Sequence, residues 1–275
     1  MSPRATPHDL ARDTPPTGPS GRLLDGLAAL VRLVPLRLAD VLAWTAAWFW
    51  WYILPIRRRT AVENLRLALP GVAVRPTLLR MMHDLVLGYL ELLQWRRVTV
   101  EIEGSEHLSG SIVVGGHGGA WDLALLACAR AAPVSIFLRT PKSRWVQAWL
   151  ARLRDENGVH RLETGATMRD GYAALAAGRA VFFIQDQRHN QGPRLDFFGR
   201  SAHTSLGAAV ASLKTGARVV GAWPSRAGVG RHRVRCEPIE LVGSEMERTV
   251  QLNAWYAARI AEHPHGWLWL HNRWR

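Results

Sequence analysis

The chain has 275 residues, with 35 Lys and Arg against 22 Asp and Glu, and its formal net charge at pH 7 is +13. With 48% hydrophobic and 21% charged residues, it is not a disordered or collagen-like chain. Two cysteines are too few for a disulfide scaffold or a four-thiolate zinc site. The 13 tryptophans and the positive charge together indicate an anionic partner surface, lipid headgroups before nucleic acid.

The first 20 residues are rich in proline, serine and threonine and contain no apolar run. Such a segment cannot bury enough apolar surface to offset the entropy lost on ordering, so we expect a disordered leader over residues 1–20. No charged stretch followed by an apolar one opens the chain. We therefore expect no cleaved secretion signal.

The next distinctive feature is an uncharged run of 16 residues from Val41 to Ile56. A membrane-spanning helix needs about 20 apolar residues, so this run is marginal for a span. Trp44, Trp48 and Trp51 fall on one stripe of a helix, and Arg57–Arg59 follow directly. One interpretation is a buried core helix. The other is a helix that lies in or dips through the cytoplasmic leaflet, with the arginines on anionic headgroups and the rest of the chain in the cytoplasm.

Helical periodicity continues over residues 60–97, and from Val98 onward short apolar runs alternate with helical stretches. This alternation predicts an α/β fold with a mixed, largely parallel sheet flanked by helices. We thus divide the chain into the leader, an N-terminal helical membrane-associating region over 21–97, and an α/β domain over 98–275. The expected strands lie at 98–102, 111–114, 134–138, 180–184, 218–223 and 233–241.

The segment Gly115–Leu126, GGHGGAWDLALL, carries the clearest chemical signal, because a strand ends in glycines and a helix begins. The carboxyl ends of strands are where α/β folds build their sites. With His117 in the turn and Asp122 one turn into the helix, Asp122 can accept the Nδ1–H of His117 and leave Nε2 free as a general base. Gly118 and Gly119 let a substrate approach the backbone closely. The alternative is a chance spacing around a structural histidine.

A second polar cluster follows the apolar strand 180–184. Asp186 stands at the end of this strand, between two glutamines. Further on, Phe197 and Phe198 form an apolar tip in a polar loop, and this tip needs the core, an acyl chain or a membrane as its partner.

Together these motifs resemble the bacterial lipid A biosynthesis acyltransferase family, the late or secondary acyltransferases of the glycerolipid-acyltransferase-like superfamily with a His-x4-Asp/Glu signature. The resemblance runs from about residue 20 to the C-terminus, in the family's order. It rests on five stretches: Ala61–Gly71 (AVENLRLALPG), His117-x4-Asp122, Asp186-Gln187, Phe197-Phe198-Gly199 and Gly266–Arg275 (GWLWLHNRWR).

The resemblance implies transfer of an acyl chain from an acyl carrier protein or coenzyme A thioester to a hydroxyl, on the cytoplasmic face of the inner membrane. It assigns the general base to His117 and the orienting acid to Asp122. The family's Arg before a Gly falls on Arg154, with Arg152 as the second register, and its acidic residue before Gln falls on Asp186. Arg154, Asp186 and the glycines of the turn are therefore the substrate-binding candidates.

The acceptor stays open, because most lipid A members of the family carry Glu where this chain has Asp122. A lipid A precursor, a phosphatidylinositol mannoside, an aminolipid or another glycolipid all fit. We expect glycine-turn N–H groups or Arg154 to meet the oxyanion. The surrounding positive charge suits a phosphate-bearing donor, an acidic carrier protein or an anionic acceptor head, and comes from Arg139, Lys142, Arg144, Arg152 and Arg154.

Two other functions compete with this hypothesis. The chain could be a non-catalytic protein that binds a membrane surface or nucleic acid, although it carries no recognised nucleic-acid motif. It could also be a thioesterase in which the same histidine activates water. We expect no cofactor, no metal site at His189 and His203, no nucleic acid partner and a monomer.

Overall fold

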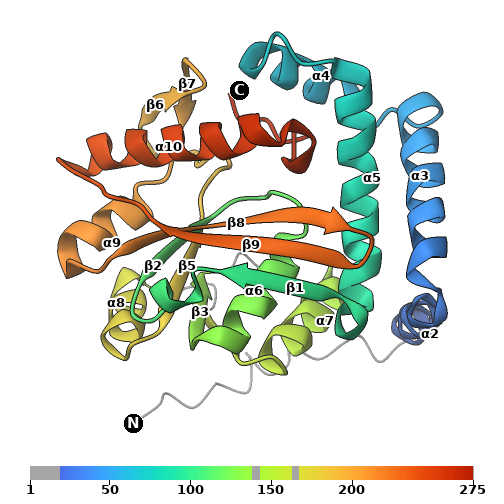
Figure 1. The fold of residues 1–275 in the computed structure, drawn as a ribbon, viewed down its shortest axis with the longest axis horizontal. Coiled ribbons are helices and arrows are strands. Elements are labelled where there is room, and N and C mark those ends of the chain that lie inside the picture. Colours follow the sequence, from blue (N-terminus) through green and yellow to red (C-terminus); the bar gives the residue numbers. More distant parts are fainter. Residues whose placement is uncertain (1–18, 138–142, 163–166, 275) are drawn as a thin grey trace.

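A computed structural model describes residues 19–137, 143–162 and 167–274 of the chain (Figure 1). Its centre is a seven-stranded sheet with the order β1-β9-β8-β2-β5-β3-β4. All neighbouring strands are parallel except β8 and β9, so the expected mixed, largely parallel sheet is confirmed. The strands are β1 (Thr99–Glu103), β2 (Ile112–Gly115), β3 (Val134–Phe137), β4 (Val159–Leu162), β5 (Ala180–Ile184), β8 (Val219–Gly228) and β9 (Arg231–Pro238).

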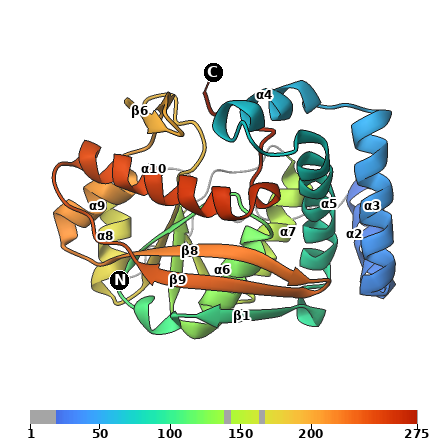
Figure 2. The same cartoon turned by 45° about the horizontal axis from the view of Figure 1, so that its top comes forward.

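Helices cover both faces of this sheet, with α10 along one face and α6 and α7 on the other (Figures 1 and 2). A small antiparallel hairpin, β6 (Arg194–Phe197) and β7 (Arg200–His203), lies beside α10. The expected strands did not include this hairpin or β4. The helices of this part are α6 (Trp121–Ala131), α7 (Arg144–Asp155), α8 (Met168–Ala176), α9 (Gly207–Thr215) and α10 (Glu245–Glu262), with short 3₁₀ turns η1 (Trp95–Arg97), η2 (Ser105–His107) and η3 (Pro264–Gly266).

The central strand β2 shows why its sequence is a continuous apolar run. Ile112 and Val114 point into the core beneath α9 and α10, whereas Val113 points into the core beneath α6 and α7. All three side chains are fully buried. A strand that is covered on both faces cannot alternate between apolar and polar residues, so its pattern differs from that of a half-exposed strand.

Within the described residues, four α-helices precede the sheet: α2 (Pro19–Leu33), α3 (Leu36–Tyr52), α4 (Arg58–Ala68) and α5 (Val74–Leu93). The long helix α5 stands against the end of the β8–β9 hairpin, and α3 packs along the outer side of α5 (Figure 1). The expected leader falls, up to residue 18, outside the described residues, and residues 19 and 20 already belong to α2.

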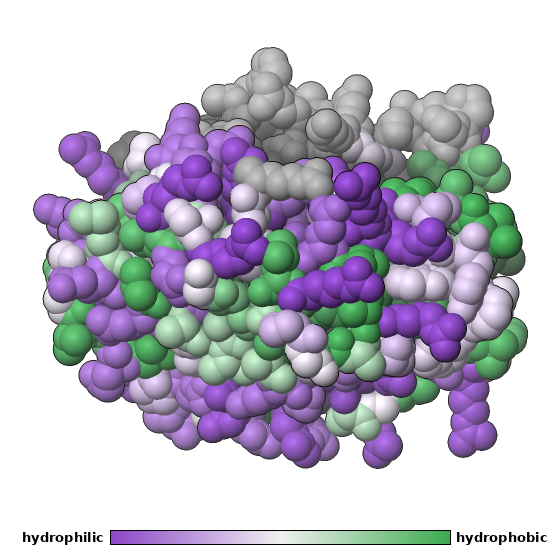
Figure 3. Space-filling model, turned by 90° about the horizontal axis from the view of Figure 1, so that it is seen from above, coloured by the Kyte–Doolittle hydropathy of each residue, from purple (hydrophilic) through white to green (hydrophobic). Residues whose placement is uncertain are grey.

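The two sides of helix α3 differ in the size of their apolar side chains rather than in polarity. Its buried stripe toward α5 is formed by Ala39, Ala43 and Ala47, whereas large apolar side chains such as Leu42, Trp48 and Phe49 are exposed. Figure 3 shows hydrophobic side chains along the edge of the molecule where α3 lies. The interpretation of this run as a buried core helix is therefore wrong. Among the described residues, no helix combines the length and apolar character that crossing a membrane requires.

The predicted tryptophan stripe of α3 is divided in the structure. Trp51 is buried, with the guanidinium of Arg58 above its ring, whereas Trp44 and Trp48 are exposed. Trp44 stacks on His83 of α5, with ring centroids 4.2 Å apart. The three indoles therefore do not share one environment, because the neighbouring helix covers only part of the stripe.

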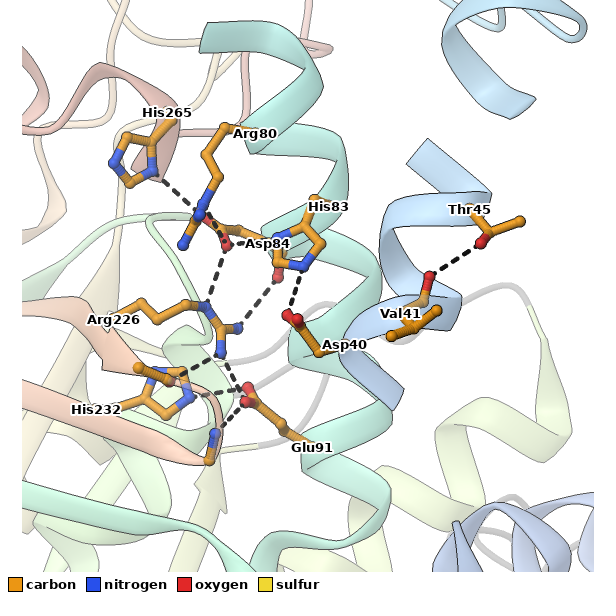
Figure 4. A network of polar contacts seen from close by, with 12 residues as sticks. Asp40, Val41, Thr45, Arg80, His83, Asp84, Glu91, Arg226, His232 and His265 are labelled. Carbon is orange, nitrogen blue, oxygen red and sulfur yellow. Dashed lines mark hydrogen bonds and ion pairs between the residues drawn. The ribbon is translucent and has the colours of Figure 1, made fainter. Parts of the chain in front are cut away.

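A buried network of charged residues joins α5 to the β8–β9 hairpin (Figure 4). Arg226 of β8 donates to Glu91 of α5 at 2.6 Å and lies 3.2 Å from Asp84, which precedes Glu91 on the same helix. His232 of β9 contacts the second oxygen of Glu91 at 2.9 Å. Burial raises the pKa of Glu91, but the hydrogen bonds from His232 and Arg226 outweigh it, so the pKa lies below its ordinary value.

The same network reaches α3 and the C-terminal segment. His83 of α5 lies between Asp40 of α3, at 2.9 Å, and Asp84, at 3.0 Å (Figure 4). His265 of η3 contacts the other oxygen of Asp84 at 3.0 Å. These contacts hold the helical N-terminal part against the strands that position the site.

We expect Glu91→Gln to lower the free energy of unfolding at pH 7 by about 3 kcal/mol, because Arg226 and His232 would both lose the buried carboxylate that they contact, and Asp84 alone would remain to balance the charge of Arg226. Since the folded-state pKa of Glu91 lies below its unfolded value, its stabilisation is present above about pH 4 and is lost as the pH falls through the folded pKa. The difference between the two proteins should therefore shrink in acid.

Urea unfolding at pH 7 and at pH 3.5 measures this difference. The matched control is Glu101→Gln, which removes the carboxylate of an exposed ion pair with Arg233 and should cost less than about 1 kcal/mol. Equal losses in the two variants at pH 7 would contradict the assignment of the buried network as a stabilising element.

Candidate active site

The site begins where β2 and β5 end side by side. These strands are parallel neighbours, and their register pairs Gly115 with Ile184. His117 and Asp186 each lie two residues beyond that last pair, so the two strands deliver them to the same edge of the sheet. The glycine turn then leads into α6, which begins at Trp121.

The imidazole of His117 is held by the carboxylate of Asp186. Its Nδ1 lies 2.8 Å from Oδ1 of Asp186, and its backbone N–H donates to Oδ2 at 2.8 Å. Trp267 donates its indole N–H to the same Oδ2 at 2.7 Å. Asp186 is fully buried, whereas the His117 side chain keeps 26% of its surface exposed. A carboxylate acceptor at Nδ1 fixes the tautomer with the lone pair on Nε2.

The expected hydrogen bond from His117 to Asp122 is absent from the structure, so this prediction is wrong. The Nδ1 atom contacts Asp186, and Asp122 instead accepts from Nη2 of Arg154 at 2.6 Å. Asp122 lies in the first turn of α6, across from α7, which carries Arg154. The sheet supplies a partner for His117 from a strand neighbour 69 residues away, and this partner replaces the local one.

Arg154 lies inside the site rather than at its surface. It is buried, its guanidinium sits 5.6 Å from the centre of the Trp121 ring, and one of its nitrogens binds Asp122. Its Nε has no hydrogen-bond partner among the described residues. Arg152, the second register, is exposed. Arg139 and Lys142 lie outside the described residues, and the side chain of Arg144 does too.

The glycines of the turn are packed against protein. A Cβ at Gly118 would come within 2.8 Å of the Trp223 ring, and one at Gly116 within 2.7 Å of the same ring. Gly119 has φ 51°, and its N–H donates to the carbonyl of Gly266 at 2.6 Å. Glycine is thus required here by close contacts and by one left-handed backbone position. The N–H of Gly119 was among the glycine-turn groups expected to meet the oxyanion, but it already donates to Gly266.

The electrostatics of the dyad favour a charged imidazole. Burial lowers the pKa of His117, but the charge and the hydrogen bond of Asp186, together with the charge of Asp122, raise it above its ordinary value. Burial raises the pKa of Asp186, and the contacts with His117 and Trp267 outweigh burial and lower it. Asp186 is therefore a carboxylate that stabilises His117 once the ring has taken a proton.

The comparison with known families decides the class of this site. The model of the family described as bacterial lipid A biosynthesis acyltransferase matches residues 23–275. The chain belongs to this family. It is a lipid acyltransferase, and the resemblance noted from its motifs is confirmed.

A solved structure is also similar to this acyltransferase. It is the 1-acyl-sn-glycerophosphate acyltransferase PlsC from Thermotoga maritima, at 15% sequence identity and a TM-score of 0.40. The match covers 82% of this chain and 97% of that one. No curated protein matches the chain.

The C-terminal segment of the acyltransferase is part of the site, which its motif alone did not reveal. Trp267 binds Asp186, and its backbone forms a β-bridge with Gly118 of the turn. Phe197 is buried in the same aromatic cluster, with its ring centroid 5.9 Å from Trp267 and 5.7 Å from Trp274. Of the three candidate partners of the Phe pair, the core is therefore the one that Phe197 contacts.

His271 is a second histidine near the dyad. Burial lowers its pKa to about 4, so it is neutral at pH 7. The sequence offered no signal for this residue beyond its place in the C-terminal motif. His189 and His203 do not form a metal cluster, and within the described ranges no group of His, Cys, Asp and Glu could hold a metal ion.

A small apolar pocket adjoins the start of α6. It lies between α5 and α6, and its lining includes Tyr89, Leu92, Trp121 and Asp122. Gly88 of α5 allows this close approach, since a Cβ there would lie 3.5 Å from the side chain of Ala120. The pocket thus connects the carboxylate that holds Arg154 with the apolar side of α5.

Proposed function

We propose that this acyltransferase moves a fatty acyl chain from a thioester of acyl carrier protein or coenzyme A to a hydroxyl of a glycolipid or lipid A precursor. The observation that carries the proposal is the partly exposed imidazole of His117, with Nδ1 bound to a buried carboxylate and Nε2 left as the basic atom. Family membership supplies the class of reaction. No serine or cysteine nucleophile is required, because the acceptor hydroxyl is itself the nucleophile.

In the proposed mechanism, Nε2 of His117 takes the proton of the acceptor hydroxyl as its oxygen attacks the thioester carbonyl carbon. The carbonyl oxygen becomes an oxyanion, and the buried Arg154, whose Nε is unpartnered among the described residues, is the proposed donor to it. The carbon–sulfur bond then breaks, and the thiolate leaves with the proton that His117 returns. Asp186 keeps the ring oriented throughout and stabilises the imidazolium.

We assign Asp122 two roles, which are to hold Arg154 and to contribute negative charge near His117. The 2.6 Å bond between the two side chains holds the arginine beside Trp121. The charge of Asp122 contributes to the raised pKa of His117. Asp122 therefore acts on His117 through its charge, and it positions Arg154 through the hydrogen bond between them, rather than bonding to Nδ1 of His117.

We further propose that α2 and α3 lie in one leaflet on the cytoplasmic face of the inner membrane. Leu33 and Ile53 are exposed by 73% and 67%, and a gathering of exposed large apolar side chains is typical of an interaction surface. The arginines that follow α3 would meet anionic headgroups. The exposed large apolar residues of α2, α3 and the segment that follows α3 are Leu23, Leu27, Leu30, Leu33, Leu38, Val41, Leu42, Trp44, Trp48, Phe49, Tyr52, Ile53, Leu54 and Ile56.

Sedimentation with anionic phospholipid vesicles tests this membrane surface. We expect the double variant Leu42→Glu/Phe49→Glu to lose most of its vesicle binding, since two carboxylates would enter the apolar layer. The control Leu213→Glu alters an equally exposed leucine on α9 and should bind vesicles like the native protein. Undiminished binding of the double variant would place the membrane contact elsewhere.

The reaction itself is tested by supplying radiolabelled acyl-carrier protein or acyl-coenzyme A together with candidate acceptors, which are a lipid A precursor, a phosphatidylinositol mannoside and an aminolipid. We expect label to appear in one lipid product and to require the acceptor. Label that appears only as free fatty acid, across all acceptors, would favour a thioesterase. Lipid analysis of a deletion strain would identify the acceptor by its missing acyl group.

A further inference from the structure

A large cavity lies apart from the catalytic dyad, where α2, the end of α5, η1 and α7 meet. Its volume is about 640 Å³. Arginines from three different elements line it: Arg32 from α2, Arg96 and Arg97 from η1, and Arg152 from α7. Neither His117 nor Asp186 is among the lining residues.

The charge of this cavity is largely uncompensated. Within the described ranges, none of the four guanidinium groups forms an ion pair. Two acids also line the cavity, Asp25 and Glu156, so its lining carries more positive than negative charge. Asp25 accepts a hydrogen bond from the indole of Trp145 at 3.2 Å. Arginines gathered around a concave surface without carboxylate partners favour an anionic ligand.

A buried amide at the same cavity gives an independent indication. Gln94 is only 4% exposed and lines the cavity. Its Oε1 accepts from Arg97 at 3.1 Å, whereas its Nε2 has no hydrogen-bond partner among the described residues. A buried N–H group without an acceptor is unfavourable, so a ligand oxygen in the cavity would stabilise it.

We propose that this cavity binds a phosphate ester. The planar guanidinium groups of Arg96 and Arg152 match phosphate oxygens in pairs, and the unpartnered Nε2 of Gln94 adds a neutral donor. Leu92 lines both this cavity and the small apolar pocket at Asp122, so the two spaces share one wall.

The identity of the molecule that carries the phosphate depends on the proposed function. The proposal of a phosphate site does not depend on it. One source is the thioester donor, whose nucleotide or pantetheine arm carries phosphates. The other is an anionic lipid headgroup, because α2 forms one wall of the cavity and exposes leucines outside it. The chemistry that the cavity recognises is the same in both cases.

Calorimetric titration of the full-length protein distinguishes these sources. The probes are adenosine 3′,5′-bisphosphate for the donor and monomeric dihexanoyl phosphatidic acid for the lipid headgroup. We expect at least one probe to bind saturably and to bind about tenfold or more weakly to the double variant Arg96→Gln/Arg152→Gln, since two charged hydrogen-bond donors are lost. Gln94→Met should also weaken binding by removing the amide.

The matched control is Arg200→Gln/Arg218→Gln, which removes the same charge at positions outside this cavity and should bind like the native protein. His117→Ala should also keep the affinity, so a failure of the proposed reaction leaves this test intact. Binding of the nucleotide probe assigns the donor, and binding of the lipid probe assigns the headgroup. Absence of saturable binding for both probes, or equal affinity in the cavity and control variants, would overturn the proposal.

Discussion

Replacing His117 by alanine should reduce acyl transfer by about 100- to 10,000-fold, because the acceptor hydroxyl would lose its general base. The fold should survive, since the ring is partly exposed and its removal leaves Asp186 bonded to Trp267 and to the backbone N–H of residue 117. The measurement is the initial rate of label transfer from the acyl thioester to the lipid acceptor. Circular dichroism and vesicle binding should match those of the native protein.

The matched control for this change is His107→Ala, a partly exposed histidine of η2 that contacts Glu106. It should transfer acyl chains at the native rate. Native activity in His117→Ala would show that His117 is not the base, whatever the geometry around it.

Asp186→Asn should be almost as damaging. An asparagine can turn its amide N–H₂ toward Nδ1, which would force the imidazole proton onto Nε2 and remove the basic lone pair from the cleft. The equivalent change in a Ser–His–Asp triad costs about 10,000-fold in kcat. We expect a loss of at least about 100-fold in kcat, measured at saturating donor and acceptor.

The control Asp155→Asn removes an exposed carboxylate that pairs with Arg161 and lies outside the site, and it should leave kcat unchanged. The thermal midpoint of Asp186→Asn must be recorded alongside, because the carboxylate is buried and also accepts from Trp267. A folded Asp186→Asn protein with native kcat would exclude Asp186 as the group that orients His117.

The residues of the site could be predicted from the sequence, but the hydrogen bonds between them could not. Both His117 and Asp186 stand just beyond apolar strands, and strand ends are where α/β folds gather their side chains. The order of the strands in the sheet could not be predicted, because it depends on contacts between residues far apart in the chain. Without that order, the nearer carboxylate, Asp122, was the natural partner for His117. Once β2 is known to pair with β5, the register points to Asp186 directly.

Helix α3 shows a second limit of prediction from sequence, which concerns the side of a helix that is covered. Composition gives an apolar run over Val41 to Ile56 but does not say which side is covered. The alanines at positions 39, 43 and 47 carry that information, because their four-residue spacing forms a smooth stripe that a neighbouring helix can approach. Large residues on the remaining surface then stay exposed. The spacing of the alanines, rather than the mean hydropathy, indicates which side of α3 its neighbour covers.

The glycine turn and the C-terminal segment depend on contacts that no local pattern reveals. The need for glycine at positions 116 and 118 arises from the Trp223 ring, more than 100 residues away in the sequence. Trp267 stabilises the carboxylate of Asp186 from the far end of the chain. The family motif marks both stretches, and the structure supplies the physical reason.

The measurement that tests the site most directly is the titration of the His117 ring by NMR, in protein labelled at its histidines and assigned with His117→Ala. In the native protein the pKa of His117 should lie above its ordinary value of 6.5. Asp186→Asn should lower it most, because the charge and hydrogen bond of Asp186 are the main groups that raise it, and Asp122→Asn should lower it less. A larger drop in Asp122→Asn than in Asp186→Asn would contradict the Asp186–His117 dyad.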